Sequence, residues 1–188
     1  DIDSPGYLFA AHSMHVPERD KDADRFMVGG PQCAKPYHAS RINISGMSYG
    51  ALSKNAVRAM NLGAKMGNFY QNTGEGSLSP HHEMGGDVVW QIGTGYFGCR
   101  DLDGHFDPKV FEQVAQKDIV KMIEIKLSQG AKPSHGGILP AGKITKEIAR
   151  IRHIHRGKDC LSPPMHSTFD SPVGLLHYVQ QLRDLSGG

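Results

Sequence analysis

Two charged residues, Glu124 and Lys126, alternate with aliphatic residues in the segment at residues 119–130. These aliphatic residues are Ile123, Ile125 and Leu127. This alternation predicts a β-strand with one apolar face and one polar face. If helices cover the apolar face, the polar face points into the protein, where a carboxylate and an ammonium group must be paired or used in chemistry. In an open sheet, the same face would be in contact with water.

Two clusters of small residues are placed where a ligand-binding turn is expected. An apolar run at residues 42–44 ends in Gly and Ser at residues 45–50, and a second run at residues 68–72 ends in a Thr-Gly-Glu-Gly turn at residues 73–76. Ser53, between the two runs, is a suitable N-cap for an amphipathic helix. This order predicts a βαβ unit, in which ligands bind at the carboxyl ends of the strands. The alternative is that the glycines only form tight turns.

The histidines and cysteines are not spaced as metal ligands. His81, His82 and Glu83 are adjacent in a polar loop, and neighbouring loop positions do not converge on one ion by themselves. The three cysteines are far apart in the sequence, at Cys33, Cys99 and Cys160. We therefore predict no metal site, although a His-based metalloenzyme stays as an alternative. The odd number of cysteines favours a reducing compartment, so we expect a cytoplasmic location.

The composition is that of a globular chain that forms one domain or part of a larger one. Its 188 residues are 38% hydrophobic and 21% charged, which is sufficient to bury a core. The net charge of +2, with scattered basic residues, gives no electrostatic basis for binding nucleic acid. The apolar runs are shorter than the ~18 residues of a membrane span, so we expect no such span.

Prolines divide the chain into an N-terminal lead-in and a main part. Residues 1–40 contain four prolines and a mixed-charge run, and we predict irregular structure there. In residues 41–188, a third strand is expected at residues 88–92. Helices are expected to begin after the capping residues Asp107, Thr145 and Ser171. The apolar side of the last helix is predicted to consist of Leu175, Leu176, Val179, Leu182 and Leu185.

Five motifs follow one another along the chain: Ser45-Gly-Met-Ser-Tyr-Gly-Ala-Leu-Ser53, Asn72-Thr-Gly-Glu-Gly76, Gln91-Ile-Gly-Thr-Gly-Tyr-Phe-Gly98, Glu124-Ile-Lys-Leu-Ser-Gln-Gly-Ala-Lys-Pro133 and Leu161-Ser-Pro-Pro164. In this order they resemble the FMN-binding domain of the glutamate synthase large subunit. The resemblance is strongest to its short stand-alone relatives, the FMN-binding glutamate synthase family proteins, and it covers residues 28–188. One such motif would be weak evidence, whereas five in order are specific.

The resemblance implies an α/β fold, a (β/α)8 TIM barrel of the FMN-dependent type. A complete barrel takes about 250 residues. The chain is therefore expected to be its N-terminal part, with residues 41–188 as the first half of the FMN-binding barrel. The implied enzyme is an oxidoreductase acting on CH–NH2 donors, in which reduced FMN delivers a hydride to 2-iminoglutarate in glutamate biosynthesis. The truncated chain alone is expected to be inactive.

The resemblance also implies roles for individual residues. The implied flavin contacts are Met47, Ser48, Gln91 and Lys126. The implied catalytic residues are Lys126 and Glu75. The implied substrate-binding residues are Gln129 and Lys132. A cation beside the flavin ring stabilises its reduced, anionic form, which suits the lysine of the polar strand face.

The sequence departs from the family pattern near the expected substrate. Ser134-His-Gly-Gly-Ile138 stands where the family commonly has Gly-Glu-Gly-Gly-Gln, and Tyr96 stands in place of an arginine. The identity of the substrate therefore stays open. The cysteine cluster of the family's [3Fe–4S] centre is absent, so an iron–sulfur cluster is expected only in a longer form.

Two kinds of partner follow from these alternatives. An enzyme would bind a small-molecule substrate and take electrons from a donor protein or reductase, and it could form a homo-oligomer. In the second reading, the chain is an incomplete, inactive barrel that binds a partner through its open sheet edge.

Overall fold

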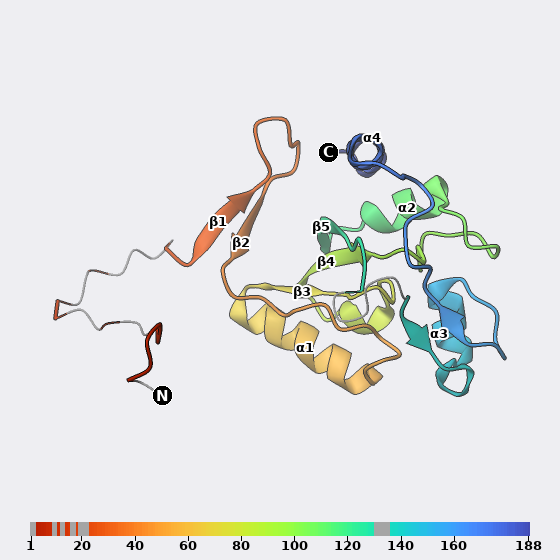
Figure 1. The fold of residues 1–188 in the computed structure, drawn as a ribbon, viewed down its shortest axis with the longest axis horizontal. Helices are drawn as coiled ribbons and strands as arrows, with labels where there is room; N and C mark the ends of the chain where they lie inside the picture. The colour runs from red at the N-terminus through yellow and green to blue at the C-terminus, as the bar shows by residue number, and fades with distance from the viewer. Residues whose placement is uncertain (1–2, 9–10, 12–13, 16–17, 19–22, 130–135) are drawn as a thin grey trace.

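The computed structural model describes residues 3–8, 11, 14–15, 18, 23–129 and 136–188 (Figure 1). The main sheet is parallel, and its strands lie in their order along the chain: β3 (Tyr70–Asn72), β4 (Asp87–Ile92) and β5 (Val120–Ile125). Ile44 forms a parallel bridge to Gln71 of β3. The predicted apolar run at residues 42–44 thus also contributes to the sheet.

Helices α1 (Lys54–Gly67) and α2 (Pro108–Ala115) connect neighbouring members of this sheet. The Ser53 hydroxyl accepts a backbone N–H of the first turn of α1 at 3.3 Å. The Asp107 carboxylate accepts two N–H groups of the first turn of α2, at 2.9 and 3.2 Å. Both predicted caps are confirmed, because each satisfies N–H groups that a helix start leaves without a partner.

Further short elements make up the rest of the described chain: the turns η1 (Pro80–His82) and η2 (Ala141–Lys143), the antiparallel pair β6 (Ile138–Leu139) and β7 (Cys160–Leu161), and the helices α3 (Lys146–Arg152) and α4 (Pro172–Ser186). Thr145 and Ser171 cap α3 and α4 through their hydroxyl groups, as predicted. A segment that contains β7 leads from α3 to α4 and runs past the loop after β4.

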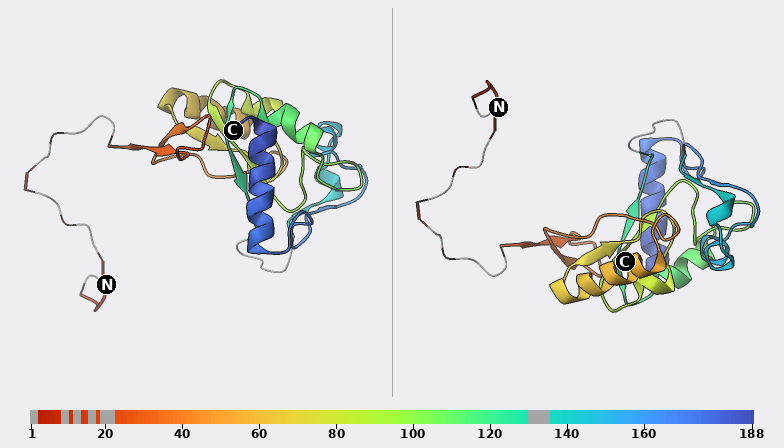
Figure 2. Two further views of the ribbon diagram at one scale, coloured as in Figure 1. Left: turned by 90° about the horizontal axis from the view of Figure 1, so that it is seen from above. Right: turned by 90° about the horizontal axis from the view of Figure 1, so that it is seen from below.

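One face of β4 and β5 is buried against α2 and α4, which lie together on the same side of the sheet (Figure 2). The buried cluster consists of Trp90, Ile92, Tyr96, Cys99, Phe111, Ala115, Tyr178 and Leu182, with Ile123 and Ile125 of β5 packed against it. Trp90 stacks on Phe111 with 5.5 Å between the ring centroids. The predicted apolar face of β5 therefore meets helices, and Glu124 and Lys126 belong to the opposite face.

The apolar side of α4 is narrower than its sequence pattern predicted. Tyr178 and Leu182, one turn apart, are its buried residues. Leu176 was predicted to lie on the same side, but its side chain is 67% exposed. A helix that packs on one neighbour buries only a stripe of residues three and four apart, which leaves Leu176 outside.

A second buried cluster joins α1 and α3 to the loops that follow the strands. Its main members are Tyr49, Val57, Phe97, Leu139, Ile144, Ile148, Ala149 and Cys160. Tyr49 belongs to the loop at residues 46–50 and is buried in this cluster, so the cluster anchors the loop.

The prediction of irregular structure for residues 1–40 is wrong over its last part. β1 (Arg25–Val28) and β2 (Tyr37–Ser40) form an antiparallel hairpin. Pro31 and Pro36 do not prevent pairing, because they lie in the turn and directly before β2. The hairpin is attached to the rest of the fold by a hydrogen bond of 2.8 Å from the Tyr37 hydroxyl to Asp87.

The α/β class is confirmed. Within the described ranges the parallel sheet is open and the pair β6–β7 is separate, so a closed barrel is not observed. No helix among the described residues is both long and apolar enough to cross a membrane.

The two small-residue clusters pack directly on each other. Gly74 has a φ of +63°, and a Cβ atom at this position would lie 2.7 Å from the backbone nitrogen of Ser48. A Cβ atom at Gly76 would lie 2.8 Å from the Ser48 Cβ. These glycines therefore allow the loop at residues 46–49 to pack on residues 74–76. If they only formed a tight turn, the absence of a Cβ atom at both positions would not be needed for this contact.

We expect the substitution Gly74→Ala to reduce the free energy of unfolding by about 2 kcal/mol, because alanine adds both a left-handed backbone penalty and a clash. Gly63→Ala is the matched control: Gly63 lies inside α1, with no atom within 4 Å of its Cβ position. That change should stabilise the protein by about 0.5–1 kcal/mol. Urea unfolding of both variants measures the difference, and equal effects would contradict the close packing.

The loop between β3 and β4 contains a buried neutral histidine. The backbone N–H of Ser79 donates to Nδ1 of His82 at 3.1 Å, so the ring hydrogen is on Nε2. The side chain is fully buried. Burial lowers the pKa of His82 to about 4. The sequence made this residue look like an exposed loop histidine.

Because the folded pKa of His82 is below the unfolded value, the neutral ring contributes stability above about pH 6.5, and this contribution is lost as the pH falls towards 4. When the pH is lowered from 7.5 to 5.0, we expect the free energy of unfolding to fall by about 2 kcal/mol more in the wild type than in His82→Gln. His177→Gln, in the exposed part of α4, should behave like the wild type. Identical pH profiles for all three proteins would refute a neutral buried ring.

Candidate functional site

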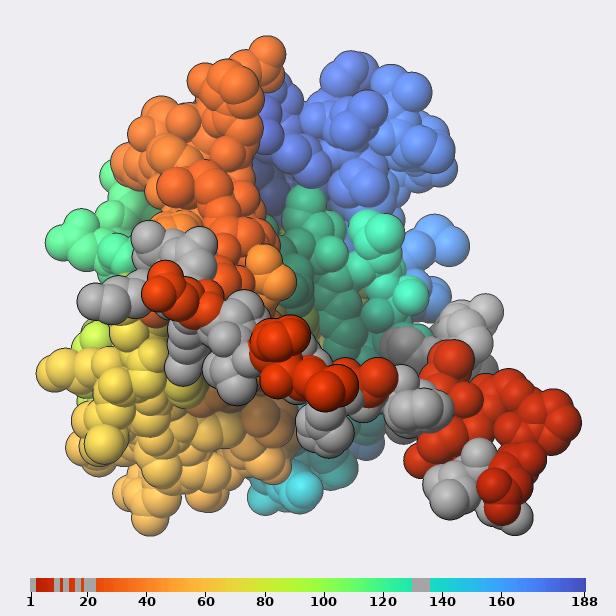
Figure 3. Space-filling model, turned by 90° about the vertical axis from the view of Figure 1, so that its left-hand side faces the viewer, coloured from red at the N-terminus to blue at the C-terminus, as the bar shows by residue number. Residues whose placement is uncertain are grey.

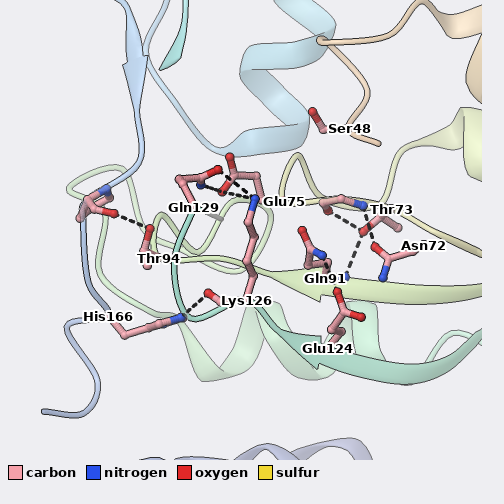
Figure 4. A network of polar contacts seen from close by, with 12 residues as sticks. Ser48, Asn72, Thr73, Glu75, Gln91, Thr94, Glu124, Lys126, Gln129 and His166 are labelled. Atoms are coloured by element: carbon pink, nitrogen blue, oxygen red, sulfur yellow. Dashed lines mark hydrogen bonds and ion pairs between the residues drawn. The ribbon is translucent and has the colours of Figure 1, made fainter. Parts of the chain in front are cut away.

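The polar face of the sheet carries amide and carboxylate side chains near the carboxyl ends of the strands (Figure 4). Gln91 of β4 donates through its amide to the Glu124 carboxylate of β5, which is the neighbour in register. A Cβ atom at Gly46 would lie 2.8 Å from the Asn72 Oδ1 and 3.1 Å from the Gln91 Nε2. The backbone at Gly46 thus passes close to the polar face at a point with no room for a side chain.

Lys126, Gln129 and Glu75 form a connected group at the end of β5. The Lys126 ammonium donates to the Gln129 Oε1 at 3.0 Å, and the Gln129 amide donates to the Glu75 Oε2 at 2.9 Å. The Lys126 Nζ lies 4.0 Å from that carboxylate oxygen. The Lys126 and Glu75 side chains are 29% and 16% exposed, respectively. The ammonium is therefore partly buried, paired, and on the side of the sheet opposite to α2 and α4.

Met47 and Ser48 lie in the loop that covers residues 74–76, shortly after the bridge residue Ile44. Met47 is 38% exposed, and Ser48 is partly buried. The structure thus brings Glu75, Lys126 and Gln129 together (Figure 4). Gln91 pairs with Glu124 instead, and Ser48 lies apart from both groups. Lys132, the other predicted substrate-binding residue, lies outside the described residues.

Arg152 lies beneath the same loops and was missed by the sequence analysis. Its guanidinium is 4% exposed, donates to the Tyr49 carbonyl at 3.0 Å, and lies 3.5 Å from the Ser48 hydroxyl. It also stacks over Phe97 at 5.2 Å from the ring centroid. Among the described residues, no carboxylate lies within ion-pair distance of it. A buried cation of this kind fixes the loop and adds positive potential to the site.

Tyr49 links the loop to α3 through a second polar contact. Its hydroxyl donates to the Glu147 carboxylate at 2.5 Å, and His81 lies 3.2 Å from the other carboxylate oxygen. Burial and this bond raise the pKa of Tyr49 to about 12, and the same bond lowers the pKa of Glu147. His81 thus lies against a carboxylate of α3. In the described ranges, no three His, Cys, Asp or Glu side chains are grouped as metal ligands would be.

Comparisons with known proteins show the family to which the chain belongs. A family model described as a conserved region in glutamate synthase matches residues 17–188. The glutamate synthase large subunit-like protein YerD of Bacillus subtilis (strain 168) is 38% identical over 162 residues, which are 85% of this chain and 31% of that protein. The archaeal glutamate synthase [NADPH] of Methanocaldococcus jannaschii is 36% identical over 144 residues, which are 76% of this chain and 26% of that protein.

A longer relative matches over a similar stretch. The glutamate synthase [NADPH] large chain of Azospirillum brasilense is 32% identical over 148 residues, 75% of this chain but 9% of that protein. The chain thus spans about a third or less of the length of these relatives. Because the family model matches most of the chain and these relatives cover at least three quarters of it, the chain belongs to the glutamate synthase family.

Proposed function

We propose that the chain forms the core of the flavin site of an oxidoreductase of the glutamate synthase type. This enzyme would reduce an imino acid such as 2-iminoglutarate to the amino acid. The observation that carries the proposal is the Lys126–Gln129–Glu75 group, partly buried at the carboxyl ends of parallel strands. Membership of the family and the names of the relatives support it.

The residues present suit FMN, which would supply the hydride when bound. Lys126 offers an ammonium donor that would stabilise negative charge on the ring. Gly46 lets the backbone of its loop lie directly against Asn72 and Gln91, so the loop meets the strand ends with no side chain between them. Met47 and Ser48 follow Gly46 in this loop, and Gln91 lies against it, so we assign these three residues as further contacts of the ring.

Two cationic side chains beside this group suit an acidic substrate, and Glu75 and Glu124 lie on the same face. Lys126 and the buried Arg152 provide positive charge, and Gln129 provides an amide between Lys126 and Glu75. Glu75 accepts a hydrogen bond from Gln129 and is 16% exposed, so its carboxylate is available to hold or accept a proton at the substrate nitrogen. We propose an imino dicarboxylate as the acceptor, with Lys132 as an additional ligand.

We also infer that the open sheet is the N-terminal part of a (β/α)8 barrel. Ile44, β3, β4 and β5 are parallel, neighbouring and in chain order, as the first strands of such a barrel would be. β5 has no strand on its other edge among the described residues. A groove of about 950 Å³ runs along this edge between β5, α4 and the β1–β2 hairpin, and Figure 3 shows the hollow.

The same groove is the one observation that favours a second function. Its lining includes the apolar side chains Ile123, Ile125, Leu127 and Val179. An incomplete barrel that binds a partner protein would use this surface. A full-length protein that is monomeric and binds FMN would exclude this alternative, whereas a flavin-free protein isolated with a bound partner would favour it.

The test of the proposed function uses the full-length protein. We expect it to be yellow, to bleach with dithionite, and to form glutamate from 2-oxoglutarate and ammonium when reduced. Lys126→Met should weaken FMN binding on the order of 10- to 100-fold, the value of one charged hydrogen bond, because the donor to the ring is lost. Lys126→Arg should retain part of the affinity, since it keeps the charge.

Lys121→Met is the matched control. Lys121 is exposed at the start of the same strand and lies 4.0 Å from Asp87. A surface pair of this kind contributes little, so FMN binding should be unchanged. A full-length protein that stays colourless and does not bind added FMN would refute the proposed function.

A further inference from the structure

His166 and Tyr96 are two buried polar residues that the proposed chemistry does not use. They are 5% and 1% exposed. His166 belongs to the segment between β7 and α4, and Tyr96 follows β4 in the chain. The His166 Nε2 lies 2.9 Å from the carbonyl oxygen of Lys126, the residue that carries the proposed flavin contact (Figure 4).

The hydrogen bonds of His166 define its tautomer. A carbonyl oxygen can only accept, so Nε2 carries a hydrogen and donates it to Lys126. Burial lowers the pKa of His166, which favours the neutral ring. Nδ1 is then an acceptor, and the Tyr96 hydroxyl, 3.0 Å away, donates to it. The three residues thus form one directed chain of hydrogen bonds.

Tyr96 also holds the segment that carries His166. Its hydroxyl oxygen accepts the backbone N–H groups of Ser167 at 3.0 Å and Thr168 at 3.2 Å. The His166 ring stacks on Phe169 with 4.8 Å between centroids. Tyr96 has a φ of +47°, a conformation that is rare for an aromatic residue. The local fold therefore maintains an unfavourable backbone at the point that directs the phenol to His166.

Lys126 is the first residue beyond β5, where the ladder to β4 ends. Its N–H donates to the Ile92 carbonyl at 2.9 Å, and its C=O accepts from His166. Both backbone groups of Lys126 are therefore held: the N–H by Ile92 of β4, and the C=O by His166 of the segment before α4. The direction of the side chain follows from this, since the ammonium must reach Gln129 at 3.0 Å.

We propose that Tyr96 and His166 are positioning residues that hold the backbone of Lys126 and thereby set the place of its ammonium group beside Gln129 and Glu75. The proposal rests on the function proposed for Lys126 in flavin binding. The pair does not touch the reacting atoms: it acts through the lysine. Its loss should therefore change the environment of the lysine more than the stability of the fold.

The test compares three variants of the full-length protein. His166→Phe keeps an aromatic ring but removes both hydrogen bonds, and His166→Gln restores a donor near the Nε2 position. Tyr96→Phe keeps the ring but removes the hydroxyl, and with it the bonds to His166, Ser167 and Thr168. Tyr178→Phe is the matched control, because it removes a buried phenol hydroxyl of the same aromatic cluster and keeps the ring that lies beside His166.

The main readout is the NMR signal of the Lys126 side chain in protein with 13C-methylated lysines, assigned by its loss in Lys126→Arg. We expect His166→Phe and Tyr96→Phe to shift this signal and its pH titration, and to weaken FMN binding about tenfold. His166→Gln should recover most of both effects, and Tyr178→Phe should cause neither.

Because the lysine signal needs no cofactor, it separates two failures. A protein that binds no FMN but shows the shifted signal would refute the proposed function and keep the positioning role. Folded variants His166→Phe and Tyr96→Phe with an unchanged Lys126 signal would overturn the positioning role, whatever their FMN affinity.

Discussion

Burial of one face of the parallel sheet is the constraint on which the other features depend. Trp90, Ile92, Ile123 and Ile125 pack against α2 and α4, and each large side chain removed from water contributes ~1.5–3 kcal/mol. Since side chains alternate along a strand, this burial directs Gln91, Glu124 and Lys126 to the other face. A shift of β5 by one residue would place two charged groups in the aromatic core. The register of the site is therefore set by the core and not by the polar groups themselves.

The loop at residues 46–49, near the carboxyl ends of the strands, is held in place by a second, smaller set of contacts. Gly74 and Gly76 allow the loop at residues 46–49 to lie directly on the turn after β3, and Arg152 fixes that loop from beneath. Buried cations are costly unless hydrogen bonds compensate for lost water, and the carbonyl of Tyr49 and the ring of Phe97 provide part of that compensation. The loop is thus held by backbone and cationic contacts, which leaves its outer surface free for a ligand.

Local signals in the sequence predicted the parts of the fold that short-range physics controls. The caps at Ser53, Asp107, Thr145 and Ser171 are confirmed, because each acts on N–H groups within three residues. The two-sided character of β5 is confirmed as well, since alternation is a property of the strand itself. Among the predicted site residues, Glu75, Lys126 and Gln129 come together, whereas Lys132 lies outside the described residues and the roles of Met47, Ser48 and Gln91 stay predictions.

The features that the sequence did not predict depend on contacts between distant segments. Arg152, in the last turn of α3, has no sequence signal that sets it apart from the other basic residues, and its burial depends on Tyr49 and Phe97. His166 gave no periodic or spacing signal, because its partners Tyr96 and Lys126 are 70 and 40 residues away. The β1–β2 hairpin was missed because its prolines suggested irregular structure, although both lie outside the paired residues.

The position of this hairpin also limits how molecules reach the site. Tyr37 binds Asp87 at the first residue of β4, Arg25 binds the Asn68 carbonyl just before β3, and Cys33 lies 3.5 Å from the Gly188 carbonyl oxygen at the end of α4. The hairpin is therefore docked at the amino-terminal end of the strands, opposite to Lys126. A molecule that contacts Lys126 would therefore approach from the opposite, carboxyl-terminal end of the strands, where the hairpin leaves its path clear.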